Sequence, residues 1–171
     1  MKTHFMLEVR GFNAGETDIR DRLARDPILA ADPQLAYVYE AVYEAVYDNP
    51  DGLKYCAVLC IGHADRVPAG SEDNRRAEEE KAAQERADNA RSWILEMVND
   101  LAYSAGYSPQ QDWPNVERAV AYQVGVGAAS LATPPGTLSA GLKNRRVEIV
   151  IAGVNVDVID TYDDQKFVLG V

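Results

Sequence analysis

The 171-residue sequence predicts an α/β fold, more closely an α+β sandwich with helices on one face of a mixed β-sheet. Three observations indicate it: apolar runs of strand length, two longer segments of helical pattern between them, and turn residues at the boundaries. The predicted order is strand–helix–strand–helix–strand–strand. We expect one domain over residues 1–153 and a C-terminal β extension, residues 154–171, packed on or beside it.

The first half of the chain alternates strand and helix. Apolar residues alternate with polar ones over residues 3–12, which is the period of a half-buried strand. Asp32-Pro33 then offers an N-cap and a first-turn proline to a helix whose tyrosines and valines each recur every four residues. An almost continuous apolar run over residues 54–61 predicts a central strand rather than an exposed edge.

The second half begins with a long helix over about residues 73–103, charged in its first part and apolar on one face in its second. We expect Gly125 and Gly127 to loosen the strand that follows. The remaining predicted segments are that strand over 119–128, a loop over 133–141, a strand over 147–152 and a short last strand over 167–169.

Charge and hydropathy exclude several functions. The net charge is −10, from 17 basic and 27 acidic residues, which argues against nucleic-acid binding and against docking on an anionic membrane. No apolar run reaches the roughly 18 residues that a membrane span needs, so we expect no membrane insertion. Glu8 and Arg10 interrupt the N-terminal apolar stretch, so no secretion signal is visible and we expect synthesis in the cytoplasm.

Catalytic and metal-binding patterns are missing from the sequence. Cys56 and Cys60 would lie about 13 Å apart on one face of a strand, too far for a disulfide, and are expected to be buried thiols. The two histidines, His4 and His63, have no metal-ligand spacing. There is no nucleophile with a base, no P-loop and no dinucleotide fingerprint, so we expect no enzyme activity and no cofactor.

Three short motifs occur in order on successive predicted elements. Gly62-His63-Ala64-Asp65 ends the central strand, Arg86-Ala87 lies in the long helix before spaced apolar positions, and Asn144-Arg145-Arg146-Val147-Glu148 opens the last core strand. Together they resemble the OmpA-like (OmpA C-terminal, MotB-like) peptidoglycan-associating domain, over roughly residues 3–152. The resemblance implies a β-α-β-α-β-β fold with its helices on one face of the sheet.

The resemblance also implies a ligand, the zwitterionic end of diaminopimelate in the peptidoglycan stem peptide. Asp65 would take its ammonium group and Arg86 its carboxylate, while Asn144 and Arg146 would line or brace the pocket. The chemistry is consistent, because an ammonium group prefers a carboxylate and a carboxylate fits a guanidinium fork. The sequence departs from the family pattern at Ala64, where the family has threonine, and in a longer segment between Asp65 and Arg86.

Two functions follow from these residues. The first is a non-catalytic cell-wall binding module, carried to the wall in a particle assembled in the cytoplasm, such as a phage tail or a contractile injection apparatus. The second is a structural or assembly protein that keeps the OmpA-like fold without the ligand and binds protein partners. In that case Asp65, Arg86 and Arg146 would form a half-buried ion network, and the C-terminal extension could add a strand to a partner's sheet.

Overall fold

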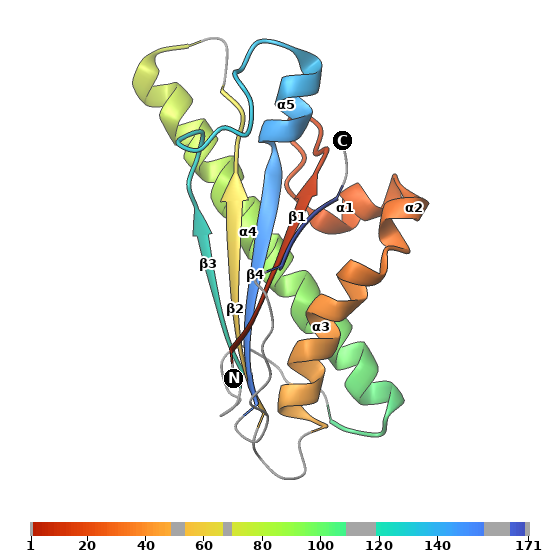
Figure 1. The fold of residues 1–171 in the computed structure, drawn as a ribbon. Coiled ribbons are helices and arrows are strands. Elements are labelled where there is room, and N and C mark those ends of the chain that lie inside the picture. The colour runs from red at the N-terminus through yellow and green to blue at the C-terminus, as the bar shows by residue number, and fades with distance from the viewer. Residues whose placement is uncertain (1, 49–53, 67–69, 109–118, 156–164, 170–171) are drawn as a thin grey trace.

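The computed structural model describes residues 2–48, 54–66, 70–108, 119–155 and 165–169, and gives side-chain surroundings for most of them (Figure 1). These residues form five strands and five helices. In chain order they are β1 (Lys2–Arg10), α1 (Ile19–Ala24), α2 (Pro27–Ala30), α3 (Pro33–Val46), β2 (Lys54–His63), α4 (Glu72–Ser104), β3 (Ala119–Gly125), α5 (Leu138–Asn144), β4 (Arg146–Asn155) and β5 (Gln165–Leu169).

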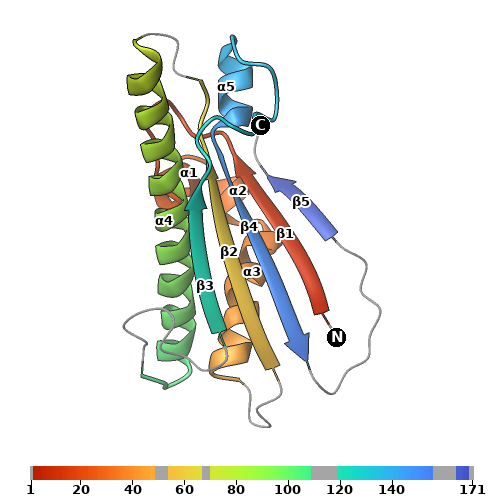
Figure 2. The same cartoon turned by 90° about the vertical axis from the view of Figure 1, so that its left-hand side faces the viewer.

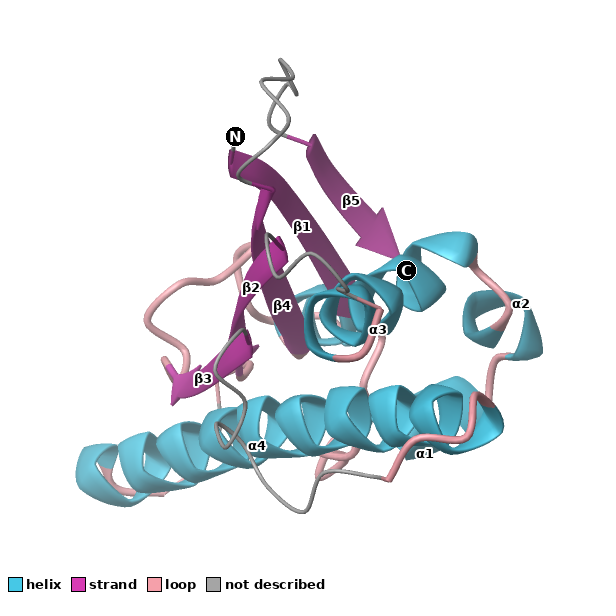
Figure 3. Ribbon diagram, turned by 90° about the horizontal axis from the view of Figure 1, so that it is seen from below, coloured by secondary structure: helices cyan, strands magenta, loops and turns pink. Residues whose placement is uncertain are grey.

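The strands form one mixed sheet in the order β3-β2-β4-β1-β5. β4 pairs antiparallel with both β1 and β2, whereas β3 pairs parallel with β2 and β5 parallel with β1. The long helices α3 and α4 both lie on one face of this sheet (Figures 2 and 3). The predicted fold class is therefore confirmed. The structure contains three further short helices, α1, α2 and α5, and the prediction of a loop up to residue 141 is wrong for the first turn of α5.

The core lies between the sheet and these two helices. The alternating residues of β1 predicted to face inward, Phe5, Leu7 and Val9, are all buried there. Cys56 and Cys60 of β2 are buried and unlinked, as expected, and burial raises the pKa of each thiol to about 12. The thiols therefore act as small apolar side chains rather than as nucleophiles.

The predicted helix starts are confirmed by their caps. The Asp32 side chain accepts a hydrogen bond from the Gln34 backbone N–H at the start of α3. Ser71 caps α4, which runs from residue 72 to residue 104 and contains most of the residues between Asp65 and Arg86. None of the helices in the described ranges is long and apolar enough to cross a bilayer.

Two glycines set the distance between α4 and the sheet. A Cβ atom on Gly62 of β2 would lie 1.8 Å from the Ala83 carbonyl oxygen, and one on Gly125 of β3 would lie 2.4 Å from the Gln84 nitrogen. The α4 backbone therefore rests directly on the backbone of both strand ends. Gly125 was expected to loosen its strand, but the close helix contact explains it better.

The predicted C-terminal extension contributes to the same sheet. Val154 and Asn155 are the last residues of β4, and β5 pairs with the outer edge of β1 from Phe5 to Val9. The central part of the extension, residues 156–164, lies outside the described residues. The division of the chain into a domain over 1–153 and an extension over 154–171 packed on or beside it stays a prediction.

We predict that Gly62→Ala destabilises the chain by about 3 kcal/mol, the upper end of overpacking costs, because the clash is with backbone that cannot move away as a side chain can. The matched control is Gly153→Ala in the neighbouring strand β4, where an added Cβ meets nothing within 4 Å. Urea denaturation of both variants measures the difference. Equal stabilities for the two variants would contradict the close helix–strand contact.

Candidate functional site

The predicted site residues come from four elements that meet at one end of the sheet, the upper end in Figure 1. β1 and β2 end there, β4 begins there, and α5 lies across the same end. Asp65 follows β2, Asn144 is the last residue of α5, and Arg146 is the first residue of β4. Arg86 enters from the inner face of α4, where it is buried.

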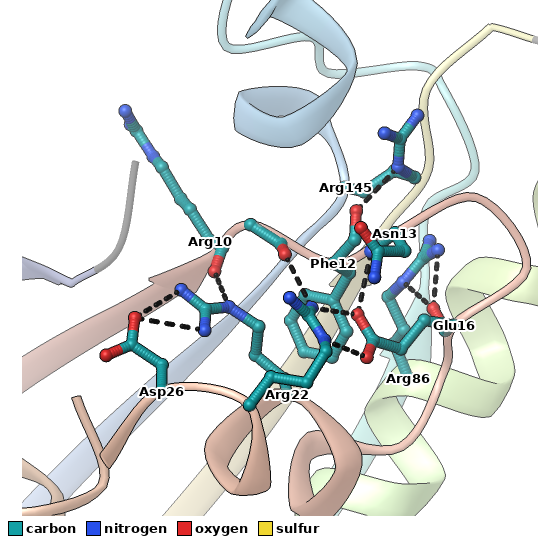
Figure 4. A network of polar contacts seen from close by, with 10 residues as sticks. Arg10, Phe12, Asn13, Glu16, Arg22, Asp26, Arg86 and Arg145 are labelled. Carbon is teal, nitrogen blue, oxygen red and sulfur yellow. Dashed lines mark hydrogen bonds and ion pairs between the residues drawn. The ribbon is translucent and has the colours of Figure 1, made fainter. Parts of the chain in front are cut away.

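Four arginines, which we call the guanidinium cluster, hold the segment of residues 10–16 that follows β1 (Figure 4). Each donates hydrogen bonds to backbone carbonyl oxygens of that segment. The bonds are Arg22 Nε to Arg10 at 2.8 Å, Arg25 Nη2 to Gly11 at 3.0 Å, Arg145 Nε to Phe12 at 2.7 Å, and Arg86 Nε and Nη2 to Glu16 at 3.1 and 2.8 Å.

Arg86 is the most deeply buried member of the cluster, with 2% of the residue exposed. Its Nη1 also donates to the His63 carbonyl oxygen at 2.7 Å, and its guanidinium carbon lies 5.5 Å from the centre of the Phe12 ring. Burial, reinforced by the nearby charge of Arg145, lowers the pKa of Arg86 to about 10. Of its N–H groups, one on each terminal nitrogen has no partner within the described part of the chain.

Two carboxylates near the cluster form ion pairs with arginines other than Arg86. Glu16 pairs with Arg25 at 2.5 Å and Asp26 with Arg22 at 3.2 Å. Within the described residues, Arg86 has no carboxylate in ion-pair contact. A buried cation without a direct counter-ion is energetically costly, and the three hydrogen bonds that Arg86 donates to backbone carbonyl oxygens offset part of that cost.

Asp65 contacts Asn144 and Arg145. It accepts a hydrogen bond from Asn144 Nδ2 at 2.8 Å, and its Oδ2 is 3.6 Å from Arg145 Nη1. Both side chains of this ion pair are partly exposed, Asp65 by 15% and Arg145 by 13%. Gly141 of α5 leaves room for the pair, since a Cβ there would lie 2.6 Å from Arg145 Nη1 and 2.9 Å from Asp65 Oδ2.

Both the oxygen and the nitrogen of the Asn144 side-chain amide are hydrogen-bonded. Its oxygen accepts from the Thr133 backbone N–H at 2.9 Å, and its nitrogen donates to the Thr133 carbonyl at 3.0 Å as well as to Asp65. The residue is fully buried. Asn144 therefore braces Asp65, joining it to the loop before α5.

Arg146 belongs to a different cluster, on the sheet face that turns away from α4. Its guanidinium contacts Glu148 at 3.1 Å and Glu8 at 3.4 Å and donates to the Ser130 carbonyl. His63 Nε2 lies 3.2 Å from Glu148 Oε1. These contacts, led by the His63 interaction, lower the pKa of Glu148 to about 2.

The structure thus joins Asp65 to Asn144 by a hydrogen bond and to Arg145 by an ion pair, and the charge of Arg145 acts on Arg86. Arg146 makes its contacts elsewhere, so its role at the pocket stays a prediction, as do the ligand roles of the other three. Arg145 is the residue that the sequence reasoning missed, although it stands inside the Asn144–Glu148 motif. The described residues contain no group of histidine, cysteine, aspartate and glutamate that could hold a metal ion.

No protein-family model and no curated protein matches this chain. Among solved structures, it is similar to the cell wall anchor of the T6SS from Pseudomonas aeruginosa, with 21% identity, 86% of this chain and 78% of that chain covered, and a TM-score of 0.41. It is also similar to the periplasmic domain of Helicobacter pylori MotB, with 16% identity, 76% and 66% covered, and a TM-score of 0.36. A third match is the peptidoglycan-associated lipoprotein from Burkholderia pseudomallei, with 14% identity, 70% and 78% covered, and a TM-score of 0.38.

The chain spans slightly less than two thirds of the MotB domain, 66% of its length. Identities under 25% and TM-scores under 0.5 transfer no residue role and no activity. The functional argument therefore rests on the motifs and on the contacts described above.

We predict that Glu148→Gln destabilises the chain at neutral pH by about 1–2 kcal/mol, after allowance for solvent screening of a partly exposed group. The folded pKa is about 2 and the ordinary value is 4.5, so the carboxylate stabilises the fold above about pH 4.5 and stops doing so as pH falls through 2. Urea denaturation from pH 7 to pH 2 should show the difference between variant and wild type shrinking toward acid. A difference that does not change with pH would contradict the ion network.

Proposed function

We propose that this chain is a non-catalytic module that binds peptidoglycan through the zwitterionic end of a diaminopimelate-type stem peptide. The observation that carries the proposal is the grouping of Asp65, Arg145 and Arg86 at one end of the sheet. One carboxylate and two guanidinium groups match a ligand with one ammonium group beside one carboxylate.

Ligand binding would exchange partners at the Asp65–Arg145 pair. At 3.6 Å this ion pair is long, and both side chains reach solvent. The ligand ammonium would replace Arg145 at Asp65, which Asn144 holds in place. The ligand carboxylate would then bind the released Arg145 guanidinium and compensate the buried charge of Arg86.

In this scheme Arg86 has two functions. Its bonds to the carbonyl oxygens of Glu16 and His63 hold the segment after β1 against the end of β2. Its charge, which has no direct carboxylate partner among the described residues, attracts the ligand carboxylate toward Arg145. The proposal keeps Asp65 and Arg86 as predicted and adds Arg145.

The route by which the module reaches the wall is a further proposal. A particle assembled in the cytoplasm, such as a phage tail or a contractile injection apparatus, would carry it there. The fold does not bear on this expectation.

One observation favours the second candidate, a structural or assembly protein without the ligand. Asp65 is already bonded to Asn144 and Arg145, and three N–H groups of Arg86 are used by backbone carbonyls. These contacts can stabilise the fold without any ligand. The two candidates differ in whether cell walls bind to the protein.

We predict that the full chain sediments with purified sacculi that contain diaminopimelate and far less with sacculi whose stems carry lysine. Lysine has the ammonium group but lacks the neighbouring carboxylate. Asp65→Asn and Arg145→Ala should each weaken binding to the first kind about tenfold or more, since each removes one charge-assisted contact.

The matched controls are Asp100→Asn and Arg20→Ala, which change surface residues on α4 and α1. Both should bind as the wild type does, and thermal melts should show that all four variants are folded. Wild-type protein that stays in the supernatant with both kinds of sacculi would rule out the module and support the structural candidate.

A further inference from the structure

A second concave site lies beside the first part of α4, and we call it the α4 pocket. Its volume is about 340 Å³. It is lined by Arg66 after β2, by Arg76, Glu79 and Glu80 of α4, and by residues 126–129 after β3. The volume is at the lower end of the range for small-molecule sites and suits a few residues of peptide.

The floor of the α4 pocket is fixed to the sheet. The Val126 N–H donates to the Gly62 carbonyl at 3.0 Å, and the Ala64 N–H donates to the Gly127 carbonyl at 2.9 Å. Gly127 has a φ of +55°, and a Cβ there would lie 3.4 Å from Glu80 Cγ, so the loop runs close against the helix. The floor is therefore a preformed surface with small aliphatic groups from Val126, Ala128 and Ala129.

The walls of the α4 pocket carry two charged side chains of opposite sign that form no ion pair with the described residues. The side chains of Arg66 and Glu80 are both exposed. Neither side chain makes a hydrogen bond or ion pair with any residue that the structure describes. Arg76, by contrast, pairs with Glu72 at 2.5 Å. The pocket thus presents one free guanidinium from the loop after β2 and one free carboxylate from α4.

The α4 pocket is distinct from the guanidinium cluster. Its lining does not include Asp65, Arg86, Asn144 or Arg145. The two sites lie on different sides of the end of β2: the pocket is next to β3, while the cluster is next to α5 and the segment after β1. Binding at one site can therefore be removed without removing a residue of the other.

We propose that the α4 pocket binds a short zwitterionic peptide with small aliphatic side chains. Arg66 takes the peptide carboxylate, and Glu80 takes the peptide ammonium group. The methyl groups of the peptide lie on Val126, Ala128 and Ala129. The inference is independent of the proposed function, because none of these residues belongs to the peptidoglycan site proposed above.

Isothermal titration calorimetry of the full chain with trialanine tests the proposal, using two blocked peptides to separate the charges. Trialanine should bind, whereas N-acetyl-trialanine and trialanine amide should each bind about tenfold more weakly. Arg66→Ala should remove the advantage of the free carboxylate and leave that of the free ammonium group. Glu80→Gln should do the reverse.

Lys81→Ala and Glu78→Gln are the matched controls, because these exposed residues of α4 do not line the pocket. Both should leave trialanine binding unchanged, and Asp65→Asn should leave it unchanged as well. The proposal is overturned if trialanine does not bind, if Arg66→Ala and Glu80→Gln do not weaken it, or if the control variants weaken it as much.

Discussion

The buried guanidinium of Arg86 is the contact on which the candidate site depends. It bonds the carbonyl oxygens of Glu16 and His63, and so joins α4, the segment after β1 and the end of β2. The same burial that makes these bonds strong also leaves its charge without a direct carboxylate partner in the described structure. Arg86 therefore stabilises the fold and, in the proposed function, attracts the ligand carboxylate.

The residues around Arg86 hold one another in place. Arg145 is held by the Phe12 carbonyl and by Asp65, so its charge is kept near Arg86 despite their repulsion. Asp65 in turn is fixed by Asn144, and Gly141 leaves the space that the ion pair fills. Asp65 and Arg145 are partly exposed, so in the proposed function they are the groups that a ligand meets first, with the buried Arg86 behind them.

The sequence predicted the sheet, both long helices and three of the four elements that carry the site, because strand alternation, helix caps and apolar stripes are local signals. It missed α5, which has only seven residues and follows two prolines and a glycine. The omission had a consequence. A strand that the motif from Asn144 onward opens would place Asn144 and Arg146 on one face and Arg145 on the other. With α5 ending at Asn144, Asn144 and Arg145 both reach Asp65, whereas Arg146 contacts Glu8 and Glu148.

Nuclear magnetic resonance of the arginine Nε–H groups, during titration with free diaminopimelate, tests the central claim most directly. If the ligand exchanges partners with the Asp65–Arg145 pair, the signals of Arg145 and Arg86 should shift together and saturate, while that of Arg20 on the surface of α1 stays in place. The account is contradicted if neither Arg145 nor Arg86 responds, or if Arg20 shifts as much as they do.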